Sequence, residues 1–108
     1  MAATSAPIDV DVLARFGEAL ADRTRQRILI ALLAGPAYPA ELADDLDCGR
    51  PNISNHLACL RGCGLVTATP EGRRTRYELA NPRLADALVT LCSLQLTPPD
   101  SDHCDLQP

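Results

Sequence analysis

The 108-residue sequence predicts a mainly α-helical domain with one small β-hairpin, a winged helix-turn-helix of about five helices and a two-stranded wing. Apolar residues recur at helical spacing in most segments, and only three residues are aromatic, which favours helices packed on helices. A tight turn at residues 47–49 separates two short helical segments, and residues 65–80 then alternate in two arms, as a β-hairpin does. A single core of this size is small, so we expect a homodimer.

Composition divides the chain into a flexible N-terminal arm (residues 1–8), the winged helix-turn-helix domain (9–96) and a flexible tail (97–108). The first helix begins after Asp9, and its apolar face consists of Val12, Leu13, Phe16, Ala19 and Leu20. The second helix runs from about residue 23 to residue 34, where Gly35 and Pro36 end it. Its arginines at positions 23, 25 and 27 either approach phosphates or are simply solvated.

The most informative segment is the helix predicted over residues 50–64, which follows a short helix over residues 39–46. Ile53, Leu57 and Leu60 recur at i, i+4 and i+7, so they form one apolar stripe that faces a core. The opposite side is rich in donors and acceptors that can meet base edges and phosphates in a major groove. We therefore predict a DNA-reading surface formed by Arg50, Asn52, Ser54, Asn55, His56 and Arg61.

The hairpin predicted after this helix turns around Pro70-Glu71-Gly72 and forms the wing. Arg73, Arg74 and Arg76 lie at its tip and on its returning strand. From there arginines can reach backbone phosphates or a minor groove. The alternative is a solvated, charged hairpin without a ligand.

A last helix is predicted to begin at Asn81-Pro82 and to end at about residue 94, with one apolar stripe along it. That stripe has no obvious partner left in so short a chain. We therefore expect the first and last helices to form a dimer interface through Leu13, Phe16, Leu20, Leu84, Leu88 and Leu91.

Charge is distributed very unevenly along the chain, whose net charge is −4. Residues 50–77 hold five of the ten basic residues, all arginine, against Glu71 alone. The local charge of +4 supports nucleic-acid binding in spite of the acidic total. The start of the chain lacks the pattern of a signal peptide and no stretch is apolar enough to span a bilayer, so we expect a cytoplasmic protein without a membrane partner.

The chain has five cysteines, an odd number that in a reducing compartment indicates metal binding, redox activity or burial better than a disulfide framework. Cys59 and Cys63 stand one helical turn apart, roughly 5–6 Å between Cβ atoms, where two thiolates can share one ion. The simpler reading is that both are small buried hydrophobes. Cys104, next to His103, lies in an acidic, proline-rich tail that offers it no core to join, whereas Cys48 and Cys92 stand at positions typical of packing residues.

Four segments, ALADRTRQRILIALL, ELADDL, SNHLACLRGCGLV and EGRRTRYEL, together resemble the ArsR/SmtB family of winged helix-turn-helix metal-sensing repressors over about residues 10–95. The helix cysteines make the chain most similar to the cadmium- and lead-sensing members. The resemblance implies a metal site formed by Cys59, Cys63 and Cys104, with Cys104 donated by the other protomer. The family's other sites are missing, since ELADDL has no cysteine and the last helix pairs no histidine with Asp86.

The sequence thus predicts a homodimeric repressor that binds operator DNA when metal-free. It would release the DNA when a soft cation, Cd²⁺ or Pb²⁺ or else Zn²⁺ or As(III), occupies the three-cysteine site. One alternative is a redox sensor of the same fold that uses Cys59 and Cys63. Others are a DNA-binding protein without a metal and, with least support, a small zinc enzyme; we expect no enzymatic activity.

Overall fold

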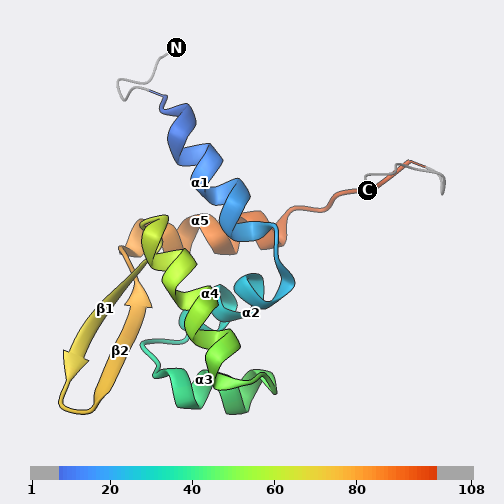
Figure 1. Ribbon diagram of the computed structural model, residues 1–108. Helices are drawn as coiled ribbons and strands as arrows, with labels where there is room; N and C mark the ends of the chain where they lie inside the picture. Colours follow the sequence, from blue (N-terminus) through green and yellow to red (C-terminus); the bar gives the residue numbers. More distant parts are fainter. Residues whose placement is uncertain (1–7, 100–108) are drawn as a thin grey trace.

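The computed structural model describes residues 8–99 and confirms the predicted winged helix-turn-helix (Figure 1). Its elements are α1 (Val10–Leu20), α2 (Arg23–Leu32), α3 (Pro39–Leu46), α4 (Arg50–Gly62), β1 (Val66–Glu71), β2 (Arg74–Leu79) and α5 (Pro82–Ser93). Most of the predicted arm and tail, including His103 and Cys104, lies outside the described residues, so the flexibility of both remains a prediction. None of the described helices is long and apolar enough to cross a membrane.

The helices begin where short polar side chains and prolines satisfy the first turn. The side chains of Asp9, Asp22 and Asn81 accept hydrogen bonds from backbone N–H groups at the starts of α1, α2 and α5. Prolines occupy the first turns of α3, α4 and α5, where a missing N–H costs no helical hydrogen bond. Asp47 ends α3 in the left-handed conformation with φ 55°, which sharpens the turn into α4.

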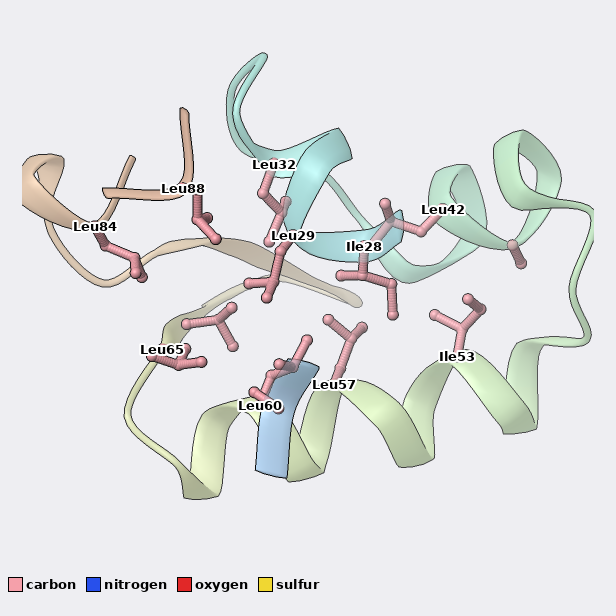
Figure 2. Packing of buried hydrophobic residues seen from close by; sticks show 13 residues of the cluster. Ile28, Leu29, Leu32, Leu42, Ile53, Leu57, Leu60, Leu65, Leu84 and Leu88 are labelled. Atoms are coloured by element: carbon pink, nitrogen blue, oxygen red, sulfur yellow. The ribbon is translucent and has the colours of Figure 1, made fainter. Parts of the chain in front are cut away.

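The apolar stripe of α4 forms the centre of the core. Ile53, Leu57 and Leu60 are each 0% exposed. They point from α4 toward two buried residues of α2, Ile28 and Leu29 (Figure 2). This packing fixes the rotation of α4 about its axis and therefore decides which of its other side chains face solvent.

Part of the α5 stripe has an internal partner, contrary to prediction. Leu84 and Leu88 are only 7% and 3% exposed and join the core of the single chain. The sequence pattern could not reveal this, because the contact depends on how the hairpin returns α5 to the body of the domain. On the same two helices, Leu13 and Leu91 remain 66% and 47% exposed.

The wing is a two-stranded antiparallel ribbon whose loop lies beyond the predicted position. Glu71 pairs with Arg74, so the turn consists of Gly72 and Arg73, and Pro70 belongs to β1. Gly72 has φ 63° at the first loop position, which suits a two-residue hairpin turn. Pro70 pairs with Thr75, next to the pair that closes the two-residue loop. In such a pair the backbone N–H groups form no hydrogen bond across the ribbon, so a proline is tolerated there.

We expect Leu57→Ala to lower the free energy of unfolding by about 2–5 kcal/mol, because it opens a cavity in the centre of the core. Thermal denaturation at fixed protein concentration measures the effect. The control is Leu96→Ala at a position 82% exposed, which should leave the melting temperature nearly unchanged. Equal melting temperatures for the two variants would contradict the packing described for α4.

Candidate functional site

The polar face of α4 is exposed as predicted. The core stripe lies on the opposite side of the helix, so this face is free for a ligand over most of its length. The exposed residues of the predicted reading surface on this helix are Arg50, Asn52, Ser54, Asn55 and Arg61. Within residues 8–99, Arg50, Asn55 and Arg61 form no ion pair or side-chain hydrogen bond, whereas Asn52 Nδ2 donates to Cys48 Sγ at 3.4 Å.

His56 is less accessible than the other residues of the predicted reading surface. It is half-buried, with Nδ1 3.3 Å from Arg25 Nη1 and Nε2 3.7 Å from Asp22 Oδ1. Arginine only donates, so Nδ1 accepts and the hydrogen of a neutral ring lies on Nε2, toward the carboxylate. The ring borders the apolar stripe of α4, and it therefore turns to α2 and not to solvent.

The polar side chains of α2 have a structural role that the sequence did not reveal. Arg25 donates from Nη2 to Glu18 O at 2.8 Å and from Nε to Ala19 O at 3.2 Å. Two neighbours act similarly: Gln26 donates to Leu20 O at 2.7 Å and Arg27 to Leu46 O at 3.0 Å. These bonds satisfy carbonyls at the C-terminal ends of α1 and α3, so Arg25 and Arg27 are neither simply solvated nor free for phosphates.

The tip of the wing is tied to the start of α3. The guanidinium of Arg74 lies 3.5 Å from the ring centroid of Tyr38, and its Nη2 is 3.4 Å from Glu41 Oε2. The hydroxyl of Tyr38 donates to Glu71 Oε1 at 2.6 Å, and this bond is the main cause of the raised pKa of Tyr38. These contacts join the hairpin to the helix-turn-helix across two elements that are far apart in sequence.

The three predicted wing arginines therefore differ in their surroundings. Arg76 forms ion pairs with Glu71 at 3.1 Å and Glu78 at 3.9 Å. Arg74 is held by Tyr38 and Glu41. Arg73 is exposed in the loop and has no ion pair within residues 8–99, so it is the wing arginine most available to a ligand.

Cys59 and Cys63 lie together at the end of α4, both half-buried. Burial raises the pKa of the Cys63 thiol above its ordinary value, and the Cys59 thiol, the Glu18 carboxylate and a hydrogen bond with the Cys59 side chain raise it further. The two thiols are therefore close enough to influence each other, and Cys63 lies near α1. The sequence predicted this pairing from the spacing alone, and the structure adds the position of α1 beside it.

The donor chemistry of the thiol pair fits a soft metal ion, which thiolates bind in preference to Mg²⁺ or Ca²⁺. Within the described range, no group of three or more histidine, cysteine, aspartate or glutamate side chains could hold a metal. A third protein donor for this pair would have to come from elsewhere. The other two described cysteines lie apart from it: Cys48 packs against the core, whereas Cys92, expected to be a packing residue, is exposed.

Comparison with known proteins gives several similar sequences. Residues 22–68 match the family described as bacterial regulatory protein, arsR family. The HTH-type transcriptional regulator CmtR of Mycobacterium tuberculosis is 56% identical over 92 residues, covering 85% of this chain and 78% of CmtR. A probable mercury resistance operon repressor of Streptomyces lividans is 40% identical over 79 residues, covering 73% and 63% of the two chains.

Solved structures with a similar fold agree with these sequence matches. The NMR structure of the cadmium metal-sensor CMTR from Mycobacterium tuberculosis has a TM-score of 0.67 at 55% identity and covers 87% of this chain and 97% of that one. The homodimeric winged helix-turn-helix DNA-binding domain Mb0332 from Mycobacterium bovis has a TM-score of 0.73 at 29% identity, covering 82% and 87%. Both structures therefore share the fold of most of this chain.

We expect Cys63 in the reduced, metal-free protein to react with iodoacetamide more slowly than Cys92 near pH 8. The thiolate is the nucleophile, and a raised pKa together with burial leaves less reactive thiolate at Cys63. The difference should shrink as the pH rises through the pKa of Cys63. Mass spectrometry of timed samples measures both rates, and the two cysteines should react alike in denaturant; faster labelling of Cys63 in the folded protein would contradict its described environment.

Proposed function

The chain belongs to the ArsR family of bacterial regulatory proteins, and from that premise we propose that it is a metal-responsive transcriptional repressor. One observation carries the proposal: α4 has an exposed polar face over its length and a half-buried thiol pair at its end. A single rigid helix therefore connects a DNA-reading surface with a site for a soft cation. The relatives are transcriptional regulators, and the chain is a regulator and not an enzyme.

We propose that α4 is the recognition helix and enters the major groove of operator DNA. Asn52, Ser54 and Asn55 can read base edges, and Arg50 and Arg61 can bind phosphates on either side. Arg73 at the wing tip adds a backbone contact, while Arg74 and Arg76 mainly hold the wing in place. As a regulator of bacterial DNA, the protein would act in the cytoplasm.

The proposed repressor is a homodimer, as is the similar Mb0332 domain. Exposed apolar side chains of α1 and α5, among them Leu13 and Leu91, line a groove together with Phe16 and Leu20. A second copy packed on this face would remove that apolar surface from water. Two copies of α4 could then enter successive major grooves roughly 34 Å apart. Leu84 and Leu88, already buried, would support the interface from within each protomer.

For the inducer site we propose Cys59, Cys63 and Cys104. Two relatives are named as a cadmium sensor and as a probable mercury resistance operon repressor, and both names agree with a soft, thiophilic inducer. Cd²⁺ or Pb²⁺ fits three sulfur donors best, and Zn²⁺ or As(III) could use the same set. When bound, the ion would supply a bond between the end of α4 and the tail.

Release of DNA follows from what the chain's own residues do at this site. Cys59 and Cys63 would hold the ion at the end of the reading helix, and Cys104 would connect the tail to it. Ordering the tail against α4 therefore changes the environment of the helix that reads the operator. A coupling free energy of about 1–3 kcal/mol would lower operator affinity about 5- to 150-fold.

The redox alternative has less support. Redox-sensing cysteines usually have lowered pKa values, because the thiolate reacts with peroxide. Here burial raises the pKa of Cys63. An operator-binding titration with Cd²⁺, Pb²⁺, Zn²⁺, Mg²⁺ and hydrogen peroxide separates the readings: the soft cations should release DNA, whereas Mg²⁺ and low peroxide should not.

Two substitutions on the proposed DNA surface should act differently. Asn55→Ala should change which operator sequences are preferred, because its amide would read a base edge. Arg73→Ala should weaken binding to all sequences by a similar factor and reduce the salt dependence, because it would contact a phosphate. Fluorescence anisotropy with operator variants at several salt concentrations measures both effects, and the reverse assignment would show that the reading surface is misplaced.

The tail ligand is tested by Cys104→Ser with Cys92→Ser as the matched control. We expect Cys104→Ser to weaken Cd²⁺ binding and to abolish most of the metal-dependent loss of operator affinity, because the site keeps only two sulfur donors. Cys92→Ser, which changes an exposed cysteine of α5, should behave as wild type. Operator affinity is measured with and without saturating Cd²⁺; full metal affinity and full release in Cys104→Ser would rule out the three-cysteine site.

A further inference from the structure

A groove beside the thiol pair is lined by residues of α1, of the segment that follows α4 and of the start of α5. Figure 1 shows how these helices are arranged. Its volume is about 520 Å³. Val12 and Phe16 of α1 provide an apolar part of its lining, and Cys63 lies at one side. Arg15 from α1 and Arg83 from the first turn of α5 also line it. The groove thus combines an apolar surface, a thiol and two positive charges.

The two arginines of this groove are not engaged by other side chains or carbonyls of residues 8–99. Outside residues 50–77 the chain has five arginines, and Arg25 and Arg27 are used to bond helix carbonyls. Within the described part of the chain, Arg15, Arg23 and Arg83 have neither an ion pair nor a side-chain hydrogen bond. Two of these three line the same groove. Two acids also lie near the groove. The Glu18 carboxylate raises the pKa of Cys63, and Asp86 lines the adjoining groove together with Arg83. Neither acid forms an ion pair with an arginine of residues 8–99.

The chain itself contains a segment of matching chemistry. Residues 100–108 hold three aspartates, at 100, 102 and 105, and neither lysine nor arginine. In an extended segment alternate side chains share one side, so Asp102, Cys104 and Leu106 would face the same way. A carboxylate, a thiol and an apolar side chain would then meet an arginine, Cys63 and the apolar lining of the groove.

The path of the chain favours the tail of a second copy. Residues 94–99 leave the far end of α5 and lead away from the groove, which lies at the start of that helix (Figure 1). Pro98 and Pro99 hold the backbone extended there. The five residues from Pro99 to Cys104 span at most about 17 Å, and α5 alone is about 18 Å long. With residues 94–99 on this path, Cys104 of the same chain would have to retrace both the extended segment and the helix.

We propose that the groove binds residues 100–108 of the partner protomer, with Arg15 and Arg83 attracting its aspartates and thereby presenting Cys104 to Cys59 and Cys63. The inference rests on the proposed three-cysteine site. It adds two positioning residues that bind no metal. Docking of this kind lowers the entropic cost of bringing a third sulfur to the site, because the tail is held close before the ion arrives.

The first test compares Cd²⁺ affinity in wild type, Arg15→Gln/Arg83→Gln and the control Arg23→Gln, an exposed arginine of α2 outside the groove. The double variant should bind Cd²⁺ about 2- to 10-fold more weakly, with a smaller loss at high salt, because exposed ion pairs are modest and screened. The same change made in Cys104→Ser should have no further effect. If Cys104→Ser alone keeps full affinity, the proposed site fails; if it weakens binding and the arginine change does not, only the docking groove is wrong.

The second test needs no metal. Backbone amide resonances of residues 100–108 in the metal-free dimer should shift in Arg15→Gln/Arg83→Gln and with added salt, but not in Arg23→Gln; identical spectra would overturn the docking.

Mixed dimers then identify the chain that donates Cys104. A protomer with Cys59→Ser and Cys63→Ser combined with a Cys104→Ser protomer should regain one high-affinity Cd²⁺ site per heterodimer, seen by thiolate-to-metal absorption. No regained site would exclude donation by the partner.

Discussion

The burial of one stripe of α4 is the interaction on which the remaining arrangement depends. Ile53, Leu57 and Leu60 are fully excluded from solvent, and each such burial contributes roughly 1.5–3 kcal/mol. Rotating α4 by even one residue position would expose part of this stripe. The rotation fixed in this way points Asn52 and Asn55 outward and leaves the thiol pair toward α1. The core therefore determines both surfaces of the proposed switch.

Arg25 connects the two surfaces physically. Its guanidinium bonds the last carbonyls of α1 and also contacts His56 on α4. It lies close enough to Cys63 to lower that thiol's pKa, although burial and the neighbouring groups raise it more. Any displacement of α1 relative to α4 must therefore change the contacts of Arg25 and His56. The thiol pair is thus close to a polar contact between Arg25 and His56 in the middle of α4.

The local elements could be predicted from sequence because they depend on neighbours within a few positions. Apolar spacing located every helix, proline and glycine located most of their ends, and the four-residue separation of Cys59 and Cys63 placed them together. Contacts between distant segments could not be predicted in this way. Among these contacts, His56 lies against Arg25 of α2, and Arg25 and Arg27 donate hydrogen bonds to carbonyls of other helices. Leu84 packs in the core of the single chain. Each depends on how whole helices cross, which spacing along one helix does not specify.

The distribution of engaged arginines bears on how the proposed switch can work. Arg74 and Arg76 are committed to holding the wing against α3 and within the ribbon, so they stiffen the DNA-binding surface and add less free charge than the sequence suggests. In the proposed repressor, Arg50, Arg61 and Arg73 remain to bind phosphates on each protomer. Binding through few phosphate contacts is moderate in strength and sensitive to salt. In the proposed switch, a modest coupling from the thiol site would then be sufficient to empty an operator.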